Sequence, residues 1–333
     1  MNYRMPAEWE PHEATWLAWP HNEDDWPGRF EPIPWIYGEI VRKLSVVERV
    51  RILVRDEELE QSARGVLTMC GAQMAAVEFH RLATDRVWTR DFAPMFVRGP
   101  AGEMAAVKWR FNGWAKYENH QADDAAGRVI PALAGVPAIY PDIVLEGGSI
   151  DVNGAGQLLT TEECLLSPVQ ARNPDLSRAE IEAAVAEYLG ADRVLWLRNG
   201  IAGDDTHGHI DDLARFTDAG SVVIVSEQDP TDQNYEPLRE NAELLRQYGL
   251  RIRKLPMPAP LYFDSVRLPA SYANFYLANG MVLAPVFNDP NDRIALNVLA
   301  DCFPNRRIVG ISCVELVWGL GTLHCMTQQQ PAR

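Results

Sequence analysis

A cysteine near the C-terminus lies in a segment whose composition suits a nucleophile. Cys325 follows the glycine-bearing stretch Gly319–Thr322, which itself follows an apolar run from Ile308 to Trp318. Glycines beside a cysteine allow close backbone approach and a flexible loop. A thiol in such a loop becomes a nucleophile when its surroundings favour the thiolate. The alternative is an inert core cysteine, which is how we interpret the other four cysteines, at positions 70, 164, 302 and 313.

A second segment, residues 203–212, concentrates acid and base groups. Seven of its ten residues are polar, and they include Asp205, His207, His209 and Asp211. A carboxylate two residues from a histidine shares one face of an extended chain with it, so an acid–base group lies beside an anion that can hold a cation. His207, His209 and Asp211 also resemble the ligand pattern of a metal-dependent hydrolase. Such sites usually draw on further clustered histidines, and the remaining five form no cluster, so metal binding is the second hypothesis.

Two further carboxylates stand where a strand begins or ends. Asp91 lies among aromatic residues in the segment Trp88–Pro94, at the start of an apparent strand. Glu146 follows the apolar residues 143–145 and precedes a glycine turn, which places it at a strand end. Taken singly, each carboxylate is explained as well by an ion pair or a turn.

These candidate groups recur at similar intervals. Asp91 and Glu146 are 55 residues apart, Glu146 and His209 are 63 apart, and His209 and Cys325 are 116 apart, close to twice the same interval. Such intervals fit repeated units that each present a strand end to one shared centre. The missing position falls in residues 268–274, which offer polar side chains but no acid.

A thiol, a histidine and several carboxylates without a metal suit a guanidinium substrate. Its planar cation presents forked N–H donors that match carboxylates bidentately. Its central carbon is electrophilic, and the bound cation would itself favour the thiolate form of the cysteine. A histidine can then protonate departing ammonia and activate water on the covalent intermediate.

Helices followed closely by strands recur along the chain and would position these groups. The clearest begins at the capping box Ser177–Glu180, ends at Gly190 and leads to a strand over residues 193–197. The same pattern predicts helix–strand pairs over residues 35–45 and 49–54, 57–70 and 74–79, 235–248 and 250–255, and 292–303 and 306–311, with a further helix over 122–133. This alternation predicts the α/β class, and its repetition favours blades or a barrel over two unlike domains. An ordinary doubly wound sheet is the alternative.

Composition limits the classes of protein that fit. The chain has 333 residues, of which 47% are hydrophobic and 23% charged, as in a globular protein with a large core. Its formal charge of −15 disfavours binding to nucleic acid or anionic membranes and favours small cations. The longest charge-free stretch, residues 268–288, is broken by prolines and a glycine, which predicts buried strands and no membrane span. Residues 1–10 contain no apolar run, and the cysteines are odd in number and widely spaced, so we expect no secretory signal and a cytoplasmic protein.

Ordered motifs extend over nearly the whole chain, at residues 5–12, 15–20, 88–91, 146–149, 205–211, 269–276 and 324–331. In this order they resemble the agmatine deiminase family of guanidine-modifying enzymes, which is related to the Porphyromonas-type peptidylarginine deiminases. The resemblance implies a fivefold pseudosymmetric α/β propeller of the pentein type, as a single domain over residues 1–333. The sequence departs from the family at Gly319–Thr322, where similar proteins carry a run of glycines before the cysteine.

The resemblance also implies roles for individual residues. It makes Cys325 the nucleophile and His209 the general acid and base. Asp91 and Asp211 would clasp the guanidinium, and Glu146 would hold the histidine and the substrate. Asp205 would receive the distal ammonium, and Trp88 and Trp114 would line the aliphatic channel. No cofactor and no metal is implied.

The expected reaction is hydrolysis of agmatine to N-carbamoylputrescine and ammonia through a covalent thiouronium intermediate on Cys325. A peptidyl-arginine or free-arginine deiminase is an alternative within the same fold. A metal-dependent hydrolase that uses His207, His209 and Asp211 is an alternative from another class, and a guanidine-binding module without activity is a third. The expected partner is a small cationic guanidine, and the sequence leaves open whether the protein is a homodimer.

Overall fold

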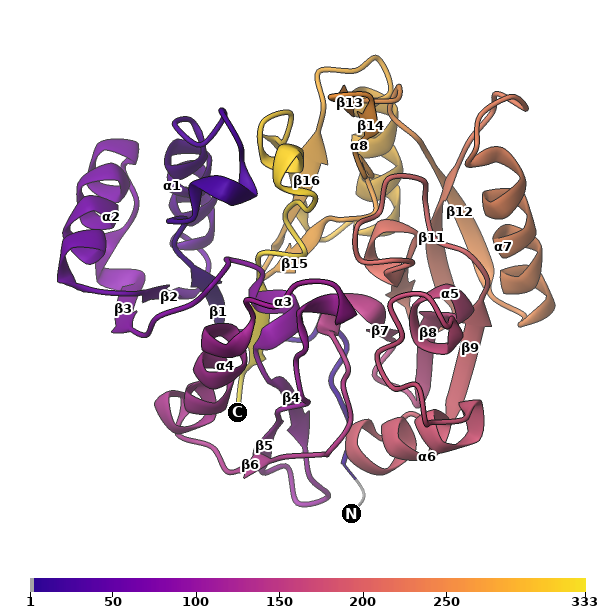
Figure 1. The fold of residues 1–333 in the computed structure, drawn as a ribbon, viewed down its shortest axis with the longest axis horizontal. Helices are drawn as coiled ribbons and strands as arrows, with labels where there is room; N and C mark the ends of the chain where they lie inside the picture. The colour runs from indigo at the N-terminus through magenta and orange to yellow at the C-terminus, as the bar shows by residue number, and fades with distance from the viewer. Residues whose placement is uncertain (1–2) are drawn as a thin grey trace.

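Five β-sheets with a shared strand order make up the architecture, in a computed structural model that describes residues 3–333. In each sheet one strand lies antiparallel to a central strand, and the central strand lies parallel to a strand that follows a helix. We call each sheet with its helices a unit and number the units from the N-terminus. In each unit, the strand that pairs antiparallel with the central strand is called the antiparallel strand. Figure 1 shows the units following one another around the molecule in chain order, with α2, α4, α6 and α7 at the periphery and α3 near the middle.

The units have the following elements. Unit 1 contains β18 (Gln328–Pro331), β1 (His12–Ala18), α1 (Ile33–Leu44), β2 (Arg49–Val54), α2 (Glu57–Cys70) and β3 (Val77–Arg81). Unit 2 contains β4 (Met95–Arg98), β5 (Met104–Val107), α4 (Gln121–Ala134) and β6 (Ala138–Ile139). Unit 3 contains β7 (Asp151–Val152), β8 (Gln157–Thr161), α5 (Glu162–Leu166), α6 (Arg178–Leu189) and β9 (Arg193–Leu197). Unit 4 contains β10 (Ala214–Asp218), β11 (Ser221–Ser226), α7 (Tyr235–Gln247) and β12 (Arg251–Pro256), and unit 5 contains β15 (Tyr276–Ala278), β16 (Met281–Val286), α8 (Asp292–Cys302) and β17 (Arg307–Ser312).

Short elements connect the units. They are the helix α3 (Thr89–Phe92), the hairpin of β13 (Tyr262–Phe263) and β14 (Val266–Arg267), and the 3₁₀ helices η1 (Glu23–Asp25), η2 (Met74–Ala76), η3 (Gly113–Ala115), η4 (Gly147–Ser149), η5 (Ile210–Asp212) and η6 (Leu316–Gly319).

The predicted helix–strand pairs are confirmed, and so is the α/β class. Helix α6 has the full capping box at Ser177 and Glu180, and it ends at Gly190, whose φ of 68° lies in the left-handed region that glycine adopts without strain. The strand expected over 74–79 begins later, at Val77, because η2 occupies its first residues. The sheets are small and separate, so the alternative of one doubly wound sheet is wrong for the described residues.

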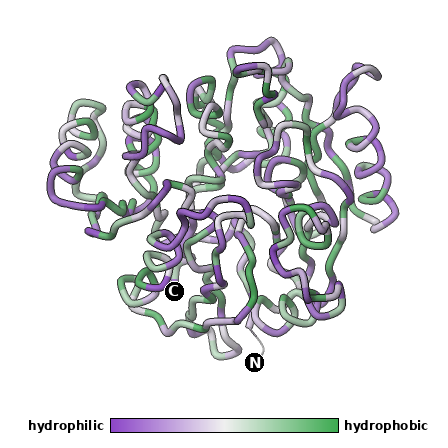
Figure 2. The backbone as a smooth tube through the Cα atoms, in the orientation of Figure 1, coloured by the Kyte–Doolittle hydropathy of each residue, from purple (hydrophilic) through white to green (hydrophobic). Residues whose placement is uncertain are grey.

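The central strands are buried on both faces, which explains their unbroken apolar sequences. Strands β11 and β16 have almost every residue buried, and both β15 and β16 lie within the charge-free stretch 268–288. Figure 2 shows hydrophobic residues concentrated along the strands, while the outer helices alternate between hydrophobic and hydrophilic residues. In residues 3–333, no helix combines the length and the apolar character needed to cross a bilayer.

The last strand of the chain belongs to the first unit. Strand β18 pairs antiparallel with β1, so unit 1 receives its antiparallel strand from the C-terminus. The side-chain carbonyl of Gln330 on β18 accepts hydrogen bonds from Trp16 Nε1 at 3.0 Å and from Arg51 Nη1 at 2.7 Å. The two ends of the chain are therefore tied together by both backbone and side-chain contacts.

Replacing Gln330 with alanine should lower the free energy of unfolding by about 1–3 kcal/mol, because two buried donors lose their acceptor. Gln328→Ala is the matched control, since the Gln328 side-chain amide has no hydrogen-bond partner among residues 3–333 and lies on the same strand. Chemical denaturation of both variants checks the difference. Equal losses of stability would contradict the importance of the Gln330 contacts.

Candidate active site

Each unit places a polar side chain shortly before its antiparallel strand. In the order of units 2, 3, 4, 5 and 1, these residues are Asp91, Glu146, His209 with Asp211, Asn274, and Cys325. The interval of about 60 residues read from the sequence is therefore the repeat of the units. The position that the spacing predicted in residues 268–274 is taken by Asn274. This residue is an amide, whereas the other units carry an acid, a histidine or a thiol there.

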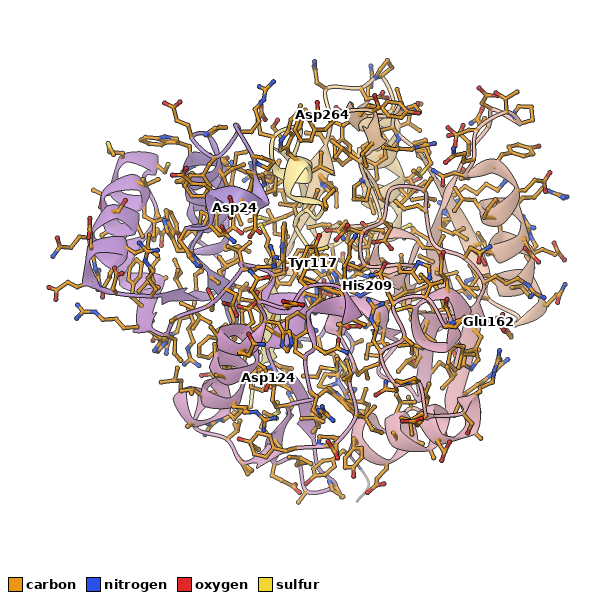
Figure 3. The ribbon with its side chains drawn as sticks, in the orientation of Figure 1. Asp24, Tyr117, Asp124, Glu162, His209 and Asp264 are labelled. Carbon is orange, nitrogen blue, oxygen red and sulfur yellow. The ribbon has the colours of Figure 1, made fainter. Side chains whose placement is uncertain are left out.

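A cavity of about 260 Å³ opens onto this group. Its lining includes Cys325 and Asp91, together with the predicted substrate-binding residues Asp205, Trp88 and Trp114. The remaining lining residues are Asn22, Asp24, Asp25, Arg86, Tyr117, Asn119, Thr206, Gly319, Leu320 and Gly321. Figure 3 shows His209 and the cavity residue Tyr117 near the middle of the view, whereas Glu162 and Asp264 lie toward its edge.

Cys325 is buried, with 7% of its surface exposed. Its Sγ accepts a hydrogen bond from Asn274 Nδ2 at 3.1 Å and lies 3.7 Å from Asp211 Oδ2. Burial raises the pKa of this thiol well above its usual value, and the neighbouring Asp211, Asp212 and Asp91 raise it further. These surroundings therefore favour the protonated thiol.

His209 is surrounded by three carboxylates. Its Nε2 lies 3.7 Å from Glu146 Oε2, and its Nδ1 lies 3.8 Å from Asp211 Oδ1 and 4.0 Å from Asp91 Oδ1. Burial opposes a charge on the ring, but Asp91, Cys164 and Glu146 outweigh it and hold the pKa of His209 well above its usual value. The surroundings of the two groups therefore favour a protonated histidine beside a protonated thiol.

Asp91 is held by two neutral donors. Its Oδ1 accepts from the Gly148 amide at 2.9 Å, and its Oδ2 accepts from Trp114 Nε1 at 2.9 Å. Burial raises the pKa of Asp91 to about 6; His209 opposes the rise, and Asp211 and Glu146 add to it. Only glycine fits at position 148, because a Cβ there would lie 2.5 Å from His209 Nδ1.

Glu146 has a cationic partner instead. Arg172 Nε donates to Glu146 Oε1 at 3.0 Å, and both side chains are fully buried. Although burial alone would raise it, Arg172 and His209 bring the pKa of Glu146 down to about 2. Its second oxygen, Oε2, has no hydrogen-bond partner among the described residues and faces His209.

Asp211 is paired with the histidine that precedes the cysteine. Its Oδ2 lies 2.7 Å from His324 Nδ1, and its Oδ1 is buried without a hydrogen-bond partner in residues 3–333. Burial would raise the pKa of Asp211, but His324 brings it below the usual value. The structure thus brings together all five residues that the sequence analysis proposes as catalytic.

The predicted substrate-binding residues line the cavity, but two of them have further contacts. The carboxylate of Asp205 is already paired with Lys116 Nζ and accepts from Tyr117 Oη at 2.7 Å. Trp114 donates to Asp91 in addition to forming the wall. Trp88 forms the wall and packs against Gly321, where a Cβ would approach its ring to 2.8 Å.

The loop before Cys325 carries the departure from a run of glycines. Leu320 has a φ of 67°, in the left-handed region that favours glycine, and it lines the cavity. The fold therefore keeps a glycine-like backbone at this position and places a branched side chain on the cavity wall.

The proposed metal set of His207, His209 and Asp211 is not supported by the geometry. His207 Nε2 lies 3.1 Å from Ser167 Oγ, and its Nδ1 lies 3.8 Å from Glu163. Among residues 3–333, the groups whose donor atoms lie close enough to share one ion are Glu146, Cys164 and His209, and Asp211, Asp212 and Cys325. His207 belongs to neither group, because its ring lies against Ser167 and Glu163 in unit 3.

Sequence reasoning missed four residues that hold the site together. Asn274 lay in a segment that the spacing singled out, but its amide gave no sign of contact with the thiol. Glu8 and His324 lay within recognised motifs without a role. No feature of the sequence pointed to Arg172, which reaches Glu146 from a loop 26 residues further along the chain.

Comparisons with known proteins agree with this geometry. A profile of the Porphyromonas-type peptidyl-arginine deiminase family matches residues 4–331. The agmatine deiminase of Pseudomonas aeruginosa is 36% identical, over 99% of this chain and 96% of its own, and a putative agmatine deiminase of Mycoplasma capricolum is 34% identical, over 98% and 95%.

Solved structures are similarly close. A cysteine-to-serine variant of the agmatine deiminase of C. jejuni with substrate bound is 32% identical and superposes with a TM-score of 0.91, over 98% of this chain and 96% of that one. The agmatine deiminase of Enterococcus faecalis is also 32% identical with a TM-score of 0.91, over 99% and 96% of the two chains. The putative arginine deiminase of Porphyromonas gingivalis is 36% identical with a TM-score of 0.90, over 99% and 98%. The chain belongs to the Porphyromonas-type peptidyl-arginine deiminase family.

Proposed function

We propose that the protein hydrolyses agmatine to N-carbamoylputrescine and ammonia. The observation that carries this proposal is the buried group of Asp91, Asp211 and Glu146 around a thiol and a histidine, with carboxylate oxygens left without partners. Such a group fits a planar cation with forked donors. Relatives that bear the name agmatine deiminase, one of them solved with substrate, support the choice of substrate.

The guanidinium would lie between Asp91 and Asp211. Both carboxylates border His209, and the free Oδ1 of Asp211 lies 3.8 Å from the ring. The arriving cation supplies the charge that these acids lack, and so it lowers the pKa of the nearby Cys325 thiol. The substrate therefore activates the nucleophile that attacks it.

The chemistry proceeds in two steps. As the cation binds, the Cys325 thiol releases its proton to solvent, and the thiolate bonds to the guanidinium carbon. The C–N bond to the terminal nitrogen then breaks as His209 gives its proton to the leaving ammonia. The product of this step is a thiouronium on Cys325. His209 then takes a proton from water, which attacks the same carbon and releases the ureido product as the C–S bond breaks. Glu146 keeps His209 oriented between the two steps.

The far end of the cavity would receive the rest of the substrate. Trp88 and Trp114 line the path of the methylene chain, and Asp205 would receive the distal ammonium. Asp205 is paired with Lys116, so the substrate ammonium would share this carboxylate with the lysine or displace the lysine from it. No cofactor takes part in this proposal.

We also propose that the five units form one catalytic domain over residues 1–333, a fivefold pseudosymmetric α/β propeller. The shared strand order and the single polar position before each antiparallel strand support this arrangement. Residues 1 and 2 lie outside the described part of the chain. The five cysteines, all within residues 3–333, are free, in keeping with a cytoplasmic location.

Purified protein should release ammonia and a ureido product from agmatine, and should act far less on arginine or peptidyl-arginine at equal concentration. Cys325→Ser should lower kcat on the order of 10³-fold or more, because the hydroxyl is a much poorer nucleophile. Cys302→Ser, at the end of α8, is the control and should keep full activity. Absence of agmatine turnover by the wild-type protein across neutral pH would refute the proposed function, and preferred turnover of arginine would reassign the substrate.

Activity should fall on the acid side as Asp91 takes up a proton, since its pKa of about 6 lies within the working range. Trp114→Phe removes a donor to the Asp91 carboxylate, so we expect the pKa of Asp91 to rise and the acid limb of kcat/KM to move to higher pH. Trp88→Phe is the matched control, because Trp88 lines the same cavity and meets Asp91 through its backbone carbonyl, whereas the donors to the Asp91 carboxylate within residues 3–333 are Trp114 and Gly148. A pH profile of kcat/KM separates the two variants, and an equal shift in both would show that the indole donor does not matter.

A further inference from the structure

His324 lies between two carboxylates, one on each ring nitrogen. Its Nδ1 is 2.7 Å from Asp211 Oδ2, and its Nε2 is 2.8 Å from Glu8 Oε2. All three side chains are buried, with exposed fractions of 2%, 0% and 6%. An ionised carboxylate can only accept hydrogen bonds, so each ring nitrogen has to donate. A ring that donates to both carboxylates carries a proton on each nitrogen.

Protonation of Glu8 instead of the ring is disfavoured by its other contacts. Glu8 Oε2 also accepts from Arg215 Nη2 at 2.8 Å, and Oε1 accepts from the Leu277 amide at 2.8 Å. Burial would raise the pKa of Glu8, but Arg215 and His324 bring it well below the usual value. A carboxylate with these donors on both oxygens is an anion.

The histidine is fixed along the backbone as well as at the ring. The side-chain carbonyl of Asn274 accepts from the His324 amide at 2.9 Å, while the amide group of the same side chain donates to Cys325 Sγ. The ring is thus joined to the N-terminal segment through Glu8 and to unit 4 through Asp211, and the backbone amide of the same residue is joined to unit 5 through Asn274. It engages one oxygen of Asp211 and leaves the other, Oδ1, facing His209.

We propose that His324 is a positioning residue, a buried imidazolium held between Asp211 and Glu8, that keeps Asp211 ionised and aims its free oxygen at the guanidinium. This inference rests on the proposed function only in naming the guanidinium as what Asp211 meets. The charge and the orientation follow from contacts within the chain. His324 touches no reacting atom and acts through Asp211.

The charged groups that face this ring come from several elements. On the cavity side they are Asp211 and, beyond it, His209, with the Cys325 thiol next along the chain. On the other side they are Glu8, Arg215 on β10, and Arg90 on α3, whose Nη2 lies 3.7 Å from Glu8. The two arginines pair with Glu8, and Tyr276 lies nearby with a pKa raised by burial, Glu48 and Glu8. His324 is therefore the cation that donates directly to Asp211.

Two substitutions separate the two ends of the ring. In His324→Asn the amide nitrogen takes roughly the place of Nδ1 and still donates to Asp211, whereas in His324→Gln it takes roughly the place of Nε2 and donates to Glu8. We expect kcat/KM for agmatine to fall about tenfold in His324→Asn and on the order of 10²-fold in His324→Gln, as is usual when a group that orients a binding residue is lost. We also expect the acid limb of kcat/KM to move to higher pH, further in His324→Gln.

His12→Gln is the control for a structural effect. His12 is also buried, with Nδ1 3.5 Å from Glu48 and Nε2 2.8 Å from the Glu8 carbonyl oxygen, but it does not contact Asp211. We expect a lower melting temperature and an unmoved acid limb. If both His324 variants lost activity and melting temperature in parallel with an unmoved acid limb, the positioning role would be overturned.

Nuclear magnetic resonance of the wild-type protein with isotope-labelled histidine tests the charge directly. We expect two protected N–H signals from the His324 ring, both absent from His324→Gln. A single N–H signal would overturn the proposal even if the variants failed to fold. The resonance result does not depend on turnover. If the wild-type protein were inactive on agmatine, the proposed function would be refuted, but the N–H signals would still determine the charge of His324.

Discussion

Buried carboxylates set the terms for the rest of this structure. Several of them lie where water is excluded, and an ion in that environment is stable only when donors or opposite charges surround it. Glu146 is paired with Arg172, and Glu8 is paired with Arg215. Asp91 receives only neutral N–H groups, which is why its pKa stays high. The shortage of positive charge is thus concentrated on the side that faces the cavity, where a cationic guanidine would compensate it.

The pairing of the C-terminal strand with unit 1 also positions the Cys325 thiol. Cys325 stands three residues before β18, the strand that the C-terminus adds to unit 1. The backbone carbonyl of Cys325 accepts from the Arg90 amide in α3, and Thr89 Oγ1 donates to the Met326 carbonyl. The register of β18 on β1 therefore fixes the height of the thiol relative to Asp91. Stability at the chain ends and geometry at the centre cannot be separated.

Local signals in the sequence were enough to predict the units but not the contacts between them. The capping box at Ser177 and the glycine at 190 fix α6 through interactions a few residues long, and the spacing of polar positions reflects the repeat. His324 and Glu8 are 316 positions apart in the sequence, and neither residue type indicates which residue it will contact. His207 shows the reverse failure, since its neighbours in sequence suggested a metal site, whereas its ring lies against Ser167 and Glu163.

The raised pKa of the Cys325 thiol has a consequence for its reactivity. Oxidants and alkylating reagents attack the thiolate, and burial among acids keeps the pKa of Cys325 far above neutral pH. A thiol whose pKa is raised by burial and by neighbouring carboxylates reacts more slowly with peroxide, and a cation bound over those carboxylates would favour the reactive thiolate. The carboxylates that would hold the substrate thus also favour the unreactive, protonated form of the thiol that attacks it.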